Sequence, residues 1–75
     1  MKKEYYIQSF KDEKFAGNNG PYTFDECEGF INYHLTEDED KETAKMLLLE
    51  EGTVDFETEH KDYGNYSFKI YKRRY

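Results

Sequence analysis

Two alternating segments near the C-terminus leave little freedom in how that part of the chain folds. TVDFETEH, residues 53–60, alternates apolar or threonine side chains with acidic ones, and YSFKIYK, residues 66–72, alternates in a similar way. Successive side chains of a strand point to opposite faces of a sheet, so both segments are typical of half-buried strands. KDYGN, residues 61–65, has the composition of a turn. The pattern predicts an antiparallel hairpin with Val54, Phe56, Phe68 and Ile70 on its inner face and Asp55, Glu57, Glu59, Lys69 and Tyr71 on its outer face.

The N-terminal part is expected to add one strand or two. EYYIQSF, residues 4–10, is rich in β-forming residues and has no helical period, so it predicts a strand. The polar KDEK cluster that follows can reverse the chain into a short second strand, KFAG at residues 14–17. GNNGP, residues 17–21, combines glycine, asparagine and proline, and we interpret it as a turn between the β region and a helical one.

Two capping boxes predict two helices. In TFDE, the hydroxyl of Thr23 would accept the amide of Glu26, whose carboxylate would accept the amide of Thr23, so a helix is expected from Phe24 to His34. TEDE at residues 36–39 repeats the pattern and starts a second helix that ends before Gly52. Helical spacing places on the inner faces Phe24, Cys27, Phe30 or Ile31, and His34 or Leu35 of the first helix, and Ala44, Leu47, Leu48 and Glu51 of the second.

The predicted elements follow one another in the order β(β)ααββ. This order fits an α+β domain of two layers, in which an antiparallel sheet of three or four strands carries both helices on one face. With 75 residues the chain is expected to form a single compact domain, residues 1–75. A domain of this size buries only about 60% of its unfolded surface.

The charge is unevenly distributed along the chain. The net charge is −6, but residues 36–62 hold eleven acids and three lysines, a local net charge of −8, while the remainder has six acids and eight bases, a net charge of +2. This balance disfavours direct binding to nucleic acid or to an anionic membrane surface, because each phosphate contact requires a cation. The single cysteine, Cys27, and the lack of a long apolar segment predict a cytoplasmic protein with no membrane partner.

The residues that could carry chemistry are not arranged for it. Cys27 and His34 would lie about 10 Å apart along one helix, too far for a nucleophile and its base to share a hydrogen bond. His60 has no second ligand at metal-binding spacing, and the acidic run beginning at Asp38 lacks the glycine and the final glutamate of a calcium loop. GNNG lacks the lysine of a phosphate-binding loop. We therefore expect no catalytic residue, no metal, no cofactor and no enzymatic activity.

Two surfaces are candidates for binding a protein. The helix-free face of the sheet would combine carboxylates with tyrosines, which are enriched at interface hot spots. Its predicted partner-binding residues, together with the acids at the start of the second helix, are Glu37, Asp38, Glu39, Asp40, Glu42, Asp55, Glu57, Glu59, Tyr71 and Tyr6. Met46 and Leu49 lie at the margin of the second helix's apolar side; either they pack on the first helix, or they mediate self-association in a homodimer or contact a partner.

The composition adds a resemblance of general character that covers no specific residues. The chain is short and acidic, without motifs, and has two alanines, two arginines and one proline. In these respects it resembles the small inhibitors that phages and other mobile elements direct against host machinery, among them anti-CRISPR proteins and DNA mimics. The leading hypothesis is an acidic protein-binding module that inhibits or modulates a nucleic-acid-handling host protein with a basic surface. The alternative is a self-associating structural or regulatory domain with no such target.

Overall fold

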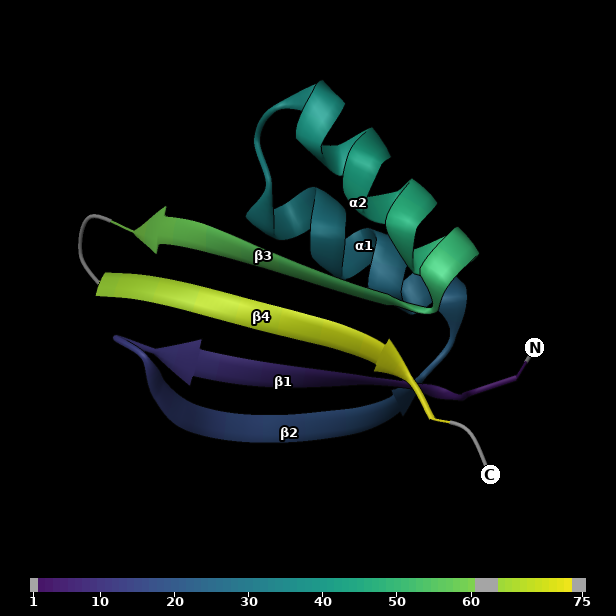
Figure 1. Cartoon of the computed structure of the whole chain (residues 1–75), viewed down its shortest axis with the longest axis horizontal. Coiled ribbons are helices and arrows are strands. Elements are labelled where there is room, and N and C mark those ends of the chain that lie inside the picture. The colour runs from purple at the N-terminus through teal and green to yellow at the C-terminus, as the bar shows by residue number, and fades with distance from the viewer. Residues whose placement is uncertain (1, 61–63, 74–75) are drawn as a thin grey trace.

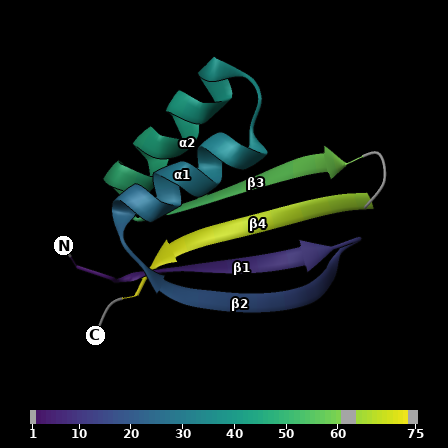
Figure 2. The ribbon, with the colours of Figure 1, turned by 180° about the vertical axis from the view of Figure 1, so that it is seen from behind.

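The computed structural model describes residues 2–60 and 64–73, without the side chains of Glu59 and His60. Its elements are β1 (Tyr5–Lys11), β2 (Lys14–Tyr22), α1 (Phe24–His34), α2 (Asp38–Glu51), β3 (Thr53–His60) and β4 (Gly64–Lys72). They form one four-stranded antiparallel sheet with both helices on one face, as the two views of the ribbon show (Figure 1, Figure 2). The predicted two-layer α+β fold is therefore confirmed, with four strands.

The sheet has the strand order β2-β1-β4-β3, so β4 and β1 are central and β2 and β3 are its edges. In the C-terminal hairpin Val54 pairs with Ile70 and Phe56 with Phe68, which is the register that the alternation predicts. The predicted KDYGN turn lies partly outside the described residues, because residues 61–63 are not among them.

The interpretation of GNNGP as a turn is wrong. Strand β2 runs through this segment to Tyr22, well past the short KFAG strand. An edge strand pairs on one side only, so it tolerates the glycines and the proline that a central strand would exclude. Its pairing with β1 shifts register twice, between Tyr5 and Ile7 and between Ser9 and Phe10. Gly20 is needed here, because it has φ of +148° and a Cβ would lie 2.7 Å from the Tyr6 ring.

Helix α1 has the predicted capping box. The amide of Glu26 donates to the Thr23 hydroxyl at 3.1 Å, and the amide of Thr23 donates to the Glu26 carboxylate at 3.0 Å. The second predicted capping box is wrong: the N-cap of α2 is Glu37, whose side chain makes no capping hydrogen bond, so Thr36 lies one residue outside the helix. Acidic side chains in the first turn of α2 interact favourably with the helix dipole without a hydroxyl cap. The helix ends before Gly52 as expected, and Gly52 has φ of +77°.

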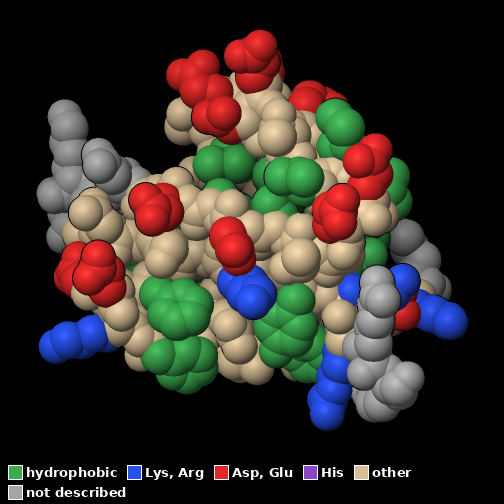
Figure 3. Space-filling model, viewed as in Figure 1, with side chains coloured by type: hydrophobic (Ala, Val, Ile, Leu, Met, Phe, Trp, Pro, Cys, Tyr) green, Lys and Arg blue, Asp and Glu red, His purple; other side chains and the backbone are tan. Residues whose placement is uncertain are grey.

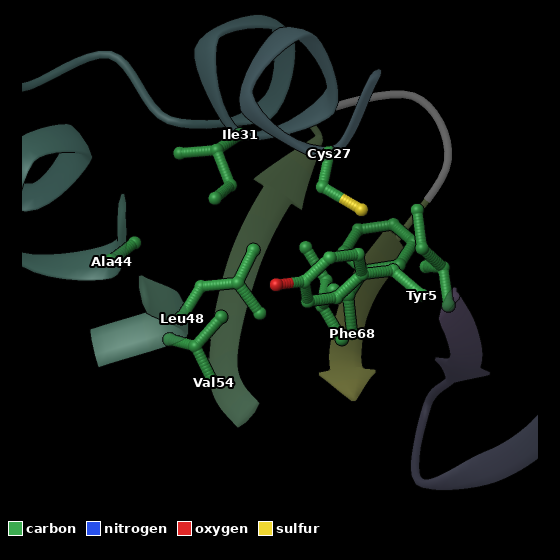
Figure 4. Close-up of a cluster of buried hydrophobic side chains, with 9 residues drawn as sticks. Tyr5, Cys27, Ile31, Ala44, Leu48, Val54 and Phe68 are labelled. Atoms are coloured by element: carbon green, nitrogen blue, oxygen red, sulfur yellow. The ribbon is translucent and has the colours of Figure 1, made fainter. Parts of the chain in front are cut away.

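The core lies between the helices and the sheet. Cys27 and Ile31 of α1 and Leu48 of α2 are fully buried, and Figure 4 shows them facing side chains from the strands. The other buried hydrophobic residues are Tyr5, Ile7, Ala44, Val54, Phe68 and Ile70. Two residues expected inside are not buried: Leu47 is 41% exposed and Glu51 is exposed. Helix α2 packs mainly along strand β3, and this contact buries only a narrow stripe of the helix that contains Ala44 and Leu48. Leu47 and Glu51 lie outside that stripe.

Candidate protein-binding face

The face of the sheet opposite the helices carries the predicted aromatic and acidic residues. We call this surface the open face; its side chains include Tyr6, Gln8, Phe10, Asp55, Glu57, Ser67, Lys69 and Tyr71. The strand register fixes this set, because Tyr6 pairs directly with Tyr71 and Asp55 directly with Lys69. Paired residues project from the same side of a sheet.

The two predicted anchors, Tyr6 and Tyr71, lie side by side. Their rings stack with centroids 5.7 Å apart and an interplanar angle of 22°. The Asn18 amide of strand β2 donates to the Tyr71 hydroxyl at 3.1 Å, and the Arg73 guanidinium lies 5.6 Å from the centre of the Tyr6 ring. Both tyrosines are half-buried. These contacts hold the pair in place, so a partner that docks on it would not have to order two free side chains.

A second aromatic pair on the open face includes a residue that the sequence analysis did not select. Phe10 pairs across strands with Phe15, and the rings meet edge to face at 5.8 Å. Phe15 is 62% exposed. Phe15, the second residue of KFAG, favoured a strand in the sequence. The face on which its side chain lies depends on the register shift at Phe10, and the sequence pattern does not define that shift.

The carboxylates of β3 border a shallow hollow on the open face. Asp55 and Glu57 are exposed, and with Phe10, Ser67 and Lys69 they line an open depression of about 660 Å³. Lys69 is the cation that faces Asp55 across the strands, whereas Glu57 faces Ser67. Glu59 was predicted to extend this row, and its side chain lies outside the described part of the chain.

One of the five predicted acids at the start of α2, Asp40, lines a groove together with acids of β3, and the other four do not line it. The side chains of Glu37, Asp38, Glu39, Asp40 and Glu42 are all exposed. Asp40 joins Asp55 and Glu57 in lining a groove of about 240 Å³, whose floor includes Leu35, Ala44 and Leu47. We call this the α2–β3 groove. The structure thus brings together one helix carboxylate and two strand carboxylates around an apolar floor.

The charges are separated in space as well as along the sequence. Figure 3 shows acidic side chains over helix α2 and strand β3, hydrophobic side chains at the surface between these elements, and basic side chains mainly toward the β1, β2 and C-terminal side. The exposed bases on that side include Lys11, Lys14, Lys72 and Arg73. Lys72 forms an ion pair with Glu4 at 3.1 Å.

The two predicted self-association residues lie on the outside of α2. Met46 is 53% exposed and Leu49 is 71% exposed. They are three positions apart, so they share one side of the helix. Neither side chain is buried against α1, and this exposure leaves both accessible for contact with a second copy or a partner.

The cysteine and the first histidine belong to the core. Burial raises the pKa of the Cys27 thiol to about 11, with a smaller contribution from the Glu26 carboxylate. The imidazole of His34 packs between Phe30 and Phe68, with ring centroids 4.4 and 4.6 Å away. Among the described residues, no three His, Cys, Asp or Glu side chains form a group that could hold a metal ion. Within the same residues, neither helix is long and apolar enough to span a membrane.

Comparison of the chain with protein-family models, with curated proteins and with solved structures finds no match.

Proposed function

We propose that this protein is a non-enzymatic binding module that docks on the basic surface of a nucleic-acid-handling protein and thereby inhibits or modulates it. The observation that carries the proposal is that Asp40 of α2 and Asp55 and Glu57 of β3 line one groove, with most exposed bases on another side. A surface built to bind phosphates presents clustered lysine and arginine, which an acidic face complements. Inhibition follows when the docked protein covers the cations that nucleic acid needs.

The tyrosine pair supports this reading of the open face. An interface that rests on charge alone gains on-rate and specificity more than affinity, so a stable complex needs buried anchors. Tyr6 and Tyr71 are held beside each other at the opposite end of the same face from Phe10 and Phe15. The carboxylates would orient the complex and the aromatic pairs would supply the apolar contact.

The proposed docking does not require the protein to copy the shape of DNA. Carboxylates on one face of a strand recur every 6.6 to 6.8 Å, roughly, whereas duplex DNA carries one charge per about 1.7 Å of its axis. Docking on a basic groove requires only that negative charges lie opposite the positive ones, without the spacing of DNA phosphates.

Self-association through Met46 and Leu49 is a second candidate function. The exposure of both side chains on one side of α2 favours it. A homodimer formed there would leave the open face accessible, because that face lies on the side of the sheet opposite the helices (Figure 1), so the two candidates are compatible in one molecule.

The proposal is tested by capture from a nuclease-treated bacterial lysate at low and at high salt. The bait is compared with two variants of equal net charge: Asp55→Lys with Glu57→Lys on the open face, and Asp25→Lys with Glu28→Lys on α1, which lies on the other side of the sheet. We expect the wild-type protein and the α1 variant to retain basic nucleic-acid-binding proteins at low salt and release them at high salt.

The open-face variant should lose those proteins while its circular dichroism spectrum stays that of the wild type. Equal capture by all three baits would reject the open face as the docking surface. A salt-independent set of captured proteins without basic surfaces would reject the proposed class of partner.

A further inference from the structure

The outer edge of strand β3 is open for pairing. The amide of Lys72 donates to the Gly52 carbonyl at 2.8 Å, and in an antiparallel pair the residues that face the partner alternate with those that face away. Even-numbered residues of β3 therefore bond to β4, while the N–H and C=O groups of Thr53, Asp55 and Glu57 point outward. No other described strand pairs with that edge.

The two edges of the sheet differ in how they are protected. Strand β2 contains Pro21 and two glycines and has two register shifts, all of which hinder the pairing of another strand. Strand β3 has neither proline nor glycine, and its register with β4 is regular from Thr53 to His60. Among the described side chains, its protection is the charge of Asp55 and Glu57. Carboxylates repel a second copy of the same edge but attract a cationic strand.

The surroundings of the edge match the two faces of such a strand. Side chains of an added strand would alternate between the open face and the helix side. On the open face they would lie beside Asp55 and Glu57. On the helix side they would enter the α2–β3 groove, which Leu35, Ala44 and Leu47 floor, and Leu47 is exposed there. Figure 3 shows hydrophobic side chains at the surface between α2 and the sheet.

We propose that β3 binds an extended segment of the partner as a fifth strand, with lysine or arginine at alternate positions and small or medium apolar residues between them. The inference rests on the proposed function and specifies how the basic partner is held. Main-chain hydrogen bonds from Thr53, Asp55 and Glu57 supply affinity, while the groove and the carboxylates select the sequence. Because every pairing in this sheet is antiparallel, the added strand is taken as antiparallel too.

The probe is an eight-residue peptide that alternates lysine and valine, titrated into the whole protein and followed by amide NMR. We expect shifts and slower hydrogen exchange at the amides of Thr53, Asp55 and Glu57, whose protons face no strand among the described residues of the free protein. Asp55→Pro removes one outward N–H at an edge, where proline is tolerated, and should weaken binding by about tenfold relative to Asp55→Asn, which removes only the charge.

Two methylated peptides separate main-chain pairing from charge attraction. In an antiparallel pair, a lysine opposite Asp55 donates its N–H to β3, so N-methylation at the lysines should abolish binding and N-methylation at the valines should not. The reverse pattern indicates a parallel fifth strand and also supports the inference. Equal binding of all three peptides, or no binding at all, overturns it. In either case the lysate capture still decides the proposed function, because docking on a basic surface does not require a strand.

Discussion

Cys27 shows how a buried residue of this protein couples its stability to pH. Burial raises the pKa of its thiol to about 11 from an ordinary value of 9.0. The folded protein therefore keeps the thiol neutral where the unfolded chain ionises it, so the stabilising contribution is complete below about pH 9 and is lost as pH rises toward 11. Burial also raises the pKa of Tyr5 above its ordinary value of 10.0, so the wild-type protein must be compared with a matched variant.

We predict that the difference in free energy of unfolding between the wild-type protein and Cys27→Ala shrinks as pH rises from about 8 to about 10.5. Urea unfolding at a series of pH values measures it, and the contribution of Tyr5 cancels in the difference. A difference that stays constant across this range would mean that the thiol is not shielded from water.

Leu48 and Leu49 are neighbours in sequence with opposite environments. Leu48 is 0% exposed in the core and Leu49 is 71% exposed on the outside of α2. Leu48→Ala should lower the free energy of unfolding by about 2–5 kcal/mol, because it leaves a cavity, whereas Leu49→Ala should change it by no more than about 0.5 kcal/mol. Chemical denaturation of both variants checks this. Similar losses from both would show that α2 is rotated from its described position.

At the scale of the elements, the two helix starts offer a matched pair of threonines. Thr23 caps α1 through its hydroxyl, while Thr36 precedes the N-cap of α2. We predict that Thr23→Ala destabilises the domain by about 1 kcal/mol and that Thr36→Ala is close to neutral. Thermal or urea unfolding distinguishes the two variants. A larger loss of stability for Thr36→Ala than for Thr23→Ala would show that Thr36 caps α2 after all.

Local patterns predicted most of the elements because their signals were repeated at several positions. The alternation through Val54 and Phe56 defined both the strand and its buried face, and Thr23 with Glu26 defined the start of α1. The prediction of a turn at GNNGP was wrong because the residues typical of a turn are also tolerated on an edge strand. Only the position of β2 at the edge of the sheet distinguishes the two. The predicted N-cap of α2 was wrong because TEDE contains several acidic residues that can begin a helix.

The candidate site was predictable only in part, because local patterns do not define how the elements pack on one another. Strand alternation was enough to place Tyr6, Tyr71, Asp55 and Glu57 on one face. The α2–β3 groove was not predictable, since it depends on where α2 lies against β3 and leaves Leu47 outside the core. Phe15 was missed because a register shift decides its cross-strand neighbour.

For the whole molecule, the first question is whether it is a monomer. The exposed Met46 and Leu49 predict a mass that increases with concentration if they mediate self-association. In that case Leu49→Glu should abolish the increase by placing a charge in an apolar contact. Sedimentation equilibrium over a wide concentration range measures this, with Tyr33→Glu on α1 as an exposed control. A wild-type protein that is monomeric throughout would reject the alternative function.

The separation of charge across the molecule is the basis of the central claim that its acidic side docks on a basic protein. Exposed carboxylates of α2 and β3 border one groove, and the basic residues lie mainly elsewhere. Such an interface is screened by salt, because attraction between exposed charges falls off over a Debye length of about 8 Å at physiological ionic strength. The salt dependence of affinity therefore reports on the carboxylates themselves.

The most direct measurement is the dissociation constant for the captured partner as a function of salt, for the wild-type protein and for the two charge-reversed pairs. We predict that affinity of the wild type falls steeply with salt, that Asp25→Lys with Glu28→Lys retains this slope, and that Asp55→Lys with Glu57→Lys weakens binding by at least about tenfold at low salt and flattens the slope. If the open-face variant binds as tightly as the wild type, with the same slope, the acidic side of the molecule is not where the partner docks.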